Sequence, residues 1–231
     1  DIAAGLVGSF TRDAGQYCTK PGVVLAPAAS EFVEAVRTEL EGVTAGRLLT
    51  DGMQRAFAEI SGELVAHPAV EVLSGADSTT LVTVISVPAE AVLAEPGLFL
   101  RECFGPLSLI VRYRDEVQLN LVLDLFEGSL TGTVHCQAGE DVRALTNRLA
   151  ALAGRVLFNG WPTGVAIAWG QHHGGPWPAT TAAIHSSVGA TAIRRWLTPV
   201  SYQDAPQSVL PVELRDETIG VPRRIDGELV R

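Results

Sequence analysis

The sequence is poor in cysteine, and the cysteines it has lie far apart. Three are present, Cys18, Cys103 and Cys136, an odd number without paired metal-ligand spacing. Such a set builds neither a disulfide framework nor a zinc motif, so we expect no bound metal and a cytoplasmic location. The sequence also lacks any run of about 18 apolar residues, the length that a transmembrane helix needs.

Basic residues are scarce relative to acidic ones. Asp and Glu number 26 against 17 Lys and Arg, and the formal net charge is −9. An acidic chain argues against nucleic acid and against an anionic membrane as partners. With 231 residues, 47% of them hydrophobic and 19% charged, the chain has enough apolar material for one large domain, with or without an appendage.

Strand-like and helix-like patterns alternate along most of the chain. Short β-branched runs indicate strands, and apolar residues at spacings of three and four indicate amphipathic helices. This alternation predicts an α/β fold with a mostly parallel sheet flanked by helices. The predicted strands cover 22–26, 70–74, 80–87, 107–113, 129–136 and 155–158, and the main helices cover 1–15, a segment capped by Ser30, one capped by Thr50 or Asp51, 88–93, 115–126 and 139–153.

The texture changes after Asn159. Residues 159–187 are rich in Gly, Pro, Trp and His without a period, which is typical of a long loop that lines a cleft. A short helix at 189–196 and an apolar strand at 198–203 follow, and then a Pro-rich tail. Because that strand has so little chain around it, we expect it to pair with another subunit in a homo-oligomer. The predicted domains are therefore 1–197 and an oligomerisation strand with its tail, 198–231.

Cys18 is the most informative single position. It follows a predicted helix within a turn that contains Gly15 and Lys20. A thiol on a tight loop beside a cation is a candidate nucleophile, and the N–H groups of such a turn can hold an oxyanion. The alternative is that Cys18 is a small core residue.

Three segments carry a family resemblance, in order along the chain. Gly15-Gln-Tyr-Cys-Thr19 resembles the active-site cysteine motif of the aldehyde dehydrogenase superfamily, Glu102-Cys-Phe-Gly-Pro106 resembles its Glu-x-Phe-Gly-Pro motif, and Arg155-Val-Leu-Phe-Asn-Gly160 resembles the segment before its substrate-side loop. The resemblance implies NAD(P)-dependent oxidation of an aldehyde to a carboxylate. Cys18 would form a thiohemiacetal and then a thioester, Glu102 would bind the nicotinamide ribose, and Phe104 would pack against the nicotinamide.

The segments from Phe158 to Gln203 are similar to the branch that oxidises alpha-ketoglutarate semialdehyde (2,5-dioxovalerate) in sugar-acid catabolism, for which NADP is the expected cofactor, with NAD as the alternative. The substrate-binding residues that this implies are Arg12, Gln16, His173 and Trp177. Arg12 could grip a distal carboxylate, which would favour succinate or glutarate semialdehyde, or it could be a surface residue paired with Asp13. Trp177 could shape the aldehyde tunnel or cap the core.

The dinucleotide-binding domain of that superfamily lies mostly before the cysteine, and no Gly-x-Gly-x-x-Gly follows a strand here. We therefore expect the chain to be the C-terminal, catalytic half of such an enzyme, inactive alone, with the cofactor bound mainly by the other half. Two alternatives remain. The chain could be a non-catalytic assembly fragment, or Cys18 could slowly hydrolyse activated esters.

Overall fold

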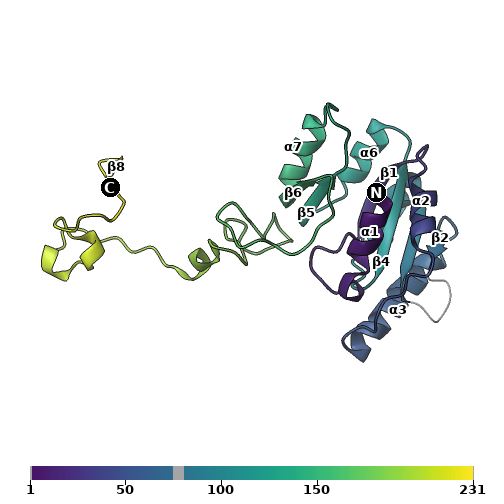
Figure 1. The fold of residues 1–231 in the computed structure, drawn as a ribbon, viewed down its shortest axis with the longest axis horizontal. Coiled ribbons are helices and arrows are strands. Elements are labelled where there is room, and N and C mark those ends of the chain that lie inside the picture. The colour runs from purple at the N-terminus through teal and green to yellow at the C-terminus, as the bar shows by residue number, and fades with distance from the viewer. Residues whose placement is uncertain (1, 75–80, 231) are drawn as a thin grey trace. The chain divides into compact units, whose positions relative to one another are not determined.

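The computed structural model describes residues 2–74 and 81–230 (Figure 1). The chain divides into two compact units, Asp1–Arg195 and Trp196–Arg231. The sequence placed this boundary two residues later, after residue 197. No helix within the described residues is both long and apolar enough to cross a membrane.

A four-stranded sheet forms the centre of the first unit. Its strands are β1 (Val23–Pro27), β2 (Glu71–Ser74), β3 (Thr83–Pro88) and β4 (Leu107–Tyr113), in the order β1-β4-β3-β2. The pairs β1–β4 and β3–β4 are parallel, and β2 runs antiparallel to β3. The predicted α/β class and mostly parallel sheet are confirmed. The first residue of the predicted strand 80–87 lies outside the described residues.

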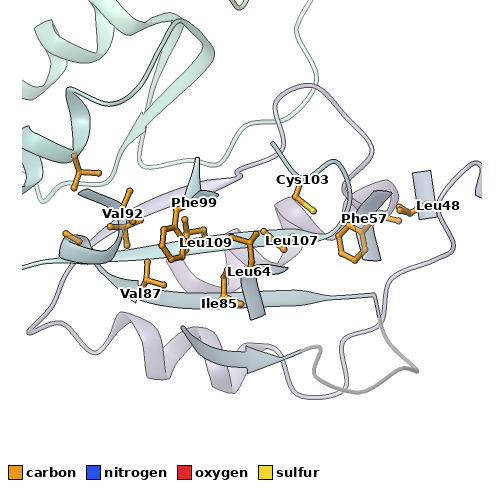
Figure 2. Packing of buried hydrophobic residues seen from close by; sticks show 14 residues of the cluster. Leu48, Phe57, Leu64, Ile85, Val87, Val92, Phe99, Cys103, Leu107 and Leu109 are labelled. Carbon is orange, nitrogen blue, oxygen red and sulfur yellow. The ribbon is translucent and has the colours of Figure 1, made fainter. Parts of the chain in front are cut away.

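Helices cover both faces of this sheet, so its central strands are buried on both sides. Val84 and Ile110 pack with α1 (Ile2–Phe10) and α2 (Phe32–Glu39) on one face. On the other face, Ile85, Val87 and Leu109 pack with four helices (Figure 2). These are α3 (Asp51–Val65), α4 (Ala89–Ala94), α5 (Pro96–Phe99) and α6 (Glu116–Leu123). Successive side chains of β3 and β4 alternate between the two cores, as the period of a strand requires.

Local capping determines where two helices begin. The hydroxyl of Thr50 accepts a hydrogen bond from the Met53 N–H, and the Asp115 carboxylate accepts one from the Gln118 N–H. Each satisfies a backbone donor that the first turn leaves free. The expectation that Ser30 caps α2 is wrong. Its hydroxyl donates to the Pro27 carbonyl in the preceding turn, and the helix begins only at Phe32.

A second, two-stranded parallel sheet follows, made of β5 (Ser129–Val134) and β6 (Ala153–Phe158), with α7 (Arg143–Leu152) between them in sequence. After β6 the chain has no further helix or strand until residue 192, as its composition predicted. The start of this segment packs on α1, since the Trp161 indole N–H donates to the Ile2 carbonyl at 2.9 Å and the Ser9 hydroxyl donates to the Pro162 carbonyl at 3.1 Å.

The predicted helix at 189–196 is a 3-10 helix, η2 (Ala192–Trp196), which ends at the boundary between the two units. The second unit is small and contains two more such turns, η3 (Gln207–Val209) and η4 (Val212–Leu214). Strands β7 (Arg223–Ile225) and β8 (Glu228–Val230) form an antiparallel hairpin that the sequence did not predict. Residues 198–203 form no strand in the single chain, which offers them no neighbour to hydrogen-bond with among the described residues. Their expected pairing with another subunit stays a prediction.

Candidate functional site

Cys18 lies on the loop between the 3-10 helix η1 (Arg12–Gly15) and β1, with its thiol side exposed. Three consecutive residues that precede Cys18 in the sequence adopt left-handed backbone conformations, with φ of 49° at Asp13, 53° at Ala14 and 68° at Gly15. Each non-glycine residue in this region costs about 1–2 kcal/mol. The loop therefore keeps its shape only because neighbouring groups hold it.

Two side chains next to the cysteine supply part of that support. The Gln16 amide donates to the Asp13 carbonyl at 2.9 Å and accepts from the Leu49 N–H at 2.7 Å. The Tyr17 hydroxyl donates to the Ser9 carbonyl at 2.7 Å. Both functions of the Gln16 amide are thus engaged with backbone groups. These bonds help to shape the loop, and the substrate-site role that the family resemblance implies for Gln16 stays a prediction.

The cysteine loop presses closely against the loop Glu102–Pro106. A Cβ atom at Gly15 would lie 2.3 Å from the Gly105 carbonyl oxygen, a distance that only glycine permits. The Lys20 ammonium donates to the carbonyls of Cys103 at 3.0 Å and Leu107 at 2.8 Å. Burial lowers the pKa of Lys20 to about 8. The sequence suggested that Lys20 acts on the Cys18 thiol, but its ammonium instead ties the two loops together.

The buried thiol of Cys103 contrasts with that of Cys18. Burial raises the pKa of Cys103 to about 11, so this residue stays protonated and packs in the core. Glu102 and Phe104, on either side of it, are exposed, and Glu102 makes no hydrogen bond or ion pair with any other described residue. Adjacent residues of this extended loop thus face opposite ways, one into the core and two outward.

His173 is brought to Cys18 from the far end of the sequence. Its Nε2 atom lies 3.3 Å from the Cys18 Sγ atom. The backbone around it is anchored, because the His173 N–H donates to the buried Ser186 hydroxyl and its carbonyl accepts from the Ser187 N–H and hydroxyl. Burial, followed by the charge of Arg155 and by His172, lowers the pKa of His173, which is therefore neutral at neutral pH.

Arg12 and Trp177 are exposed and make no side-chain hydrogen bond or ion pair in the part of the chain that the structure describes. The alternative pairing of Arg12 with Asp13 is therefore not observed either. Within residues 2–74 and 81–230, no group of three or more His, Cys, Asp or Glu side chains is arranged to hold a metal ion.

Sequence reasoning missed Ser186 and Ser187, which hold His173 in place. Two adjacent serines in a loop form no sequence motif that predicts a contact. Their hydrogen bonds with His173 join residues 13 positions apart for Ser186 and 14 for Ser187. The burial of Ser186, at 3% exposure, marks it as structural only once the fold is known.

Comparison with known proteins adds sequence relatives and structural neighbours. No protein-family profile matches the chain. It is 41% identical over 238 residues to alpha-ketoglutaric semialdehyde dehydrogenase 2 of Azospirillum brasilense. This alignment covers 98% of the present chain and 45% of the relative. The chain is 31% identical to alpha-ketoglutaric semialdehyde dehydrogenase of Acinetobacter baylyi, covering 100% of this chain and 46% of the relative. The chain thus spans about half the length of the curated relatives it matches.

Among solved structures, a double mutant of betaine aldehyde dehydrogenase from Staphylococcus aureus, in complex with NAD+, superposes with a TM-score of 0.68. The match covers 85% of this chain and 41% of that one, at 17% identity. At this identity the likeness concerns the fold, which agrees with the sheet and helices described above.

Proposed function

Because residues 1–231 belong to the aldehyde dehydrogenase superfamily, we propose that the protein oxidises an aldehyde to a carboxylate with a nicotinamide cofactor, using Cys18 as the nucleophile. The observation that carries this proposal is the placement of Cys18. Its thiol is exposed on a strained loop that is held against the loop bearing Glu102 and Phe104. An accessible thiol on a rigid turn is what covalent catalysis on an aldehyde requires.

The chain's own groups account for the first covalent step, the attack on the aldehyde. The Cys18 sulfur attacks the aldehyde carbon, and the Cys18 N–H, which makes no hydrogen bond within the described residues, is available to the oxyanion that develops. This gives a thiohemiacetal, which becomes a thioester once the carbon has been oxidised. Water then hydrolyses the thioester and releases the carboxylate.

A bound nicotinamide cofactor would supply the acceptor for the hydride that the thiohemiacetal carbon loses. Two residues of this chain fit such a group. The Glu102 carboxylate makes no hydrogen bond or ion pair with another described residue, so it can accept hydrogen bonds from the hydroxyls of a ribose. Phe104 is 38% exposed, so its ring can pack against a flat heterocycle. From the branch resemblance we propose NADP in preference to NAD, with most of the cofactor contacts made by residues outside this chain.

For the substrate we propose alpha-ketoglutarate semialdehyde, the aldehyde named for both curated relatives. His173 beside Cys18 lines the position where it would react, and the exposed guanidinium of Arg12 and ring of Trp177 are proposed to contact its distal end. We further propose a homo-oligomer that pairs through 198–203, where Val200 is 68% exposed, and a cytoplasmic location, which the free thiols support.

The test uses the protein expressed from its complete reading frame, with its intact mass measured. Reduction of NADP and of NAD is followed with alpha-ketoglutarate, succinate and glutarate semialdehydes. We expect turnover that is fastest with the first aldehyde, lost in Cys18→Ala and retained in the matched variant Cys136→Ala. Turnover that survives Cys18→Ala, or its absence with every aldehyde and both cofactors, would refute the proposal.

A further inference from the structure

His173 occupies a position that the covalent steps above do not yet use. Its imidazole and the Cys18 thiol form a pair whose members are 155 residues apart in sequence, with Nε2 and Sγ separated by 3.3 Å. This is within the reach of a hydrogen bond to sulfur. Three hydrogen bonds hold the His173 backbone: its N–H donates to the Ser186 hydroxyl, and its carbonyl accepts from the Ser187 N–H and hydroxyl. The contact with Cys18 therefore comes from an anchored chain segment.

We propose that His173 accepts the proton of the Cys18 thiol as the sulfur attacks the aldehyde, a proposal that rests on the aldehyde-oxidising function above. In this step the S–H bond breaks and the S–C bond forms. The proton moves to Nε2, and the electron pair of the carbonyl π bond moves to the oxygen. The imidazolium later releases its proton to water. A histidine that transfers a proton to or from a reacting atom acts as a general base.

The surroundings favour a neutral pair at rest. The Nδ1 atom of His173 is buried and has no hydrogen-bond partner among the described residues. No carboxylate of these residues is among the groups that shift its pKa. The charged or polar groups that act on it are the cationic Arg155 of β6 and the neighbouring His172. All of these disfavour or fail to stabilise an imidazolium. Proton transfer is therefore expected to accompany attack on the electrophile rather than to precede it.

The test measures the thiol directly and needs no cofactor. The protein is treated with iodoacetamide, and the rate of labelling at Cys18 is followed by peptide mass spectrometry for the wild type, His173→Gln and the matched control His172→Gln. At neutral pH we expect His173→Gln to react about tenfold more slowly, a conservative figure for the loss of a positioned proton acceptor. His172→Gln is expected to react like the wild type.

A structural role for His173 predicts different results. Added imidazole should restore the labelling rate of His173→Ala if a proton acceptor is missing, and should leave it unchanged if the loop has merely shifted. The pKa of His173 lies below the ordinary histidine value of 6.5. The labelling rate of the wild type should therefore show a drop at a pH well below 6.5, where His173 becomes protonated, and His173→Gln should show no such drop. Equal labelling rates in His173→Gln and the wild type, or the absence of rescue by imidazole, would overturn the inference.

The same variants separate this inference from the proposed function. If His173→Gln slows labelling while the wild type oxidises none of the aldehydes, the proton acceptor stands and the proposed function fails. If the wild type oxidises the aldehyde and His173→Gln neither slows labelling nor lowers kcat/KM, the function stands and the inference fails. Thermal unfolding of each variant, compared with the wild type, checks that the fold is retained.

Discussion

Replacing Gly15 by alanine tests the close contact between the two loops of the site. The added Cβ would lie 2.3 Å from the Gly105 carbonyl oxygen, 2.4 Å from its carbon and 2.8 Å from the Pro106 nitrogen. All three are backbone atoms and cannot rotate away, so the loops must move apart. Gly15 also has a φ of +68°, where a side chain is strained.

The two effects have separate magnitudes. The left-handed conformation costs an alanine about 1–2 kcal/mol, and forcing an extra carbon into a tightly packed contact costs about 1–3 kcal/mol more. Gly15→Ala should therefore lower the free energy of unfolding by about 2–5 kcal/mol in total. Because the movement separates Cys18 from the Glu102 loop, activity should fall as well.

Gly42→Ala is the matched control, since Gly42 has a φ of +73° and nothing within 4 Å of its added Cβ. It should cost only the conformational part, about 1–2 kcal/mol. Urea unfolding of both variants gives the difference between their free energies of unfolding. Effects of the substitution on the unfolded chain largely cancel in this difference, because both variants replace glycine by alanine. Equal losses in the two variants would refute the reasoning, because the contact between the loops would then carry no steric cost.

Two further predictions concern residues that support the same loops. Phe57, whose ring contacts Gly105 and is 4% exposed, anchors the core, so Phe57→Ala should lower the free energy of unfolding by about 3–5 kcal/mol. A loss below about 1 kcal/mol in urea unfolding would contradict its placement. For Lys20, the unfolded chain holds more protons than the folded one between pH 8 and 10.5, so stability should rise with pH across that window, by about 3 kcal/mol at most. Lys20→Met should abolish this rise in thermal unfolding, and a rise that persists would assign it to another group.

Local sequence signals predicted most elements of the first unit. The apolar run at 107–113 predicted β4 with the bounds that the structure has, because a strand buried on both faces needs a continuous run of apolar and small residues. Thr50 or Asp51 was predicted to cap α3, and the structure shows that the Thr50 hydroxyl satisfies a backbone donor in the next turn. Both signals act within a few residues and can be read without the fold.

The elements near the C-terminus of the given sequence were predicted less well. The strand expected at 198–203 stays a prediction, because it needs a partner subunit and the described chain offers no neighbouring strand there. The hairpin β7–β8 was missed, because its strands have three residues each and carry almost no periodicity.

For the site, the residue types and motifs of the sequence determined that Cys18 is the candidate nucleophile and that Glu102 and Phe104 belong to the same region. Only the tertiary structure decided what surrounds them. It turned the Lys20 ammonium toward the carbonyls of Cys103 and Leu107, and it brought His173 to the Cys18 thiol across 155 residues. The physical reason is that the direction of a side chain depends on the packing of segments remote in sequence, whereas its chemistry is already present in the residue type.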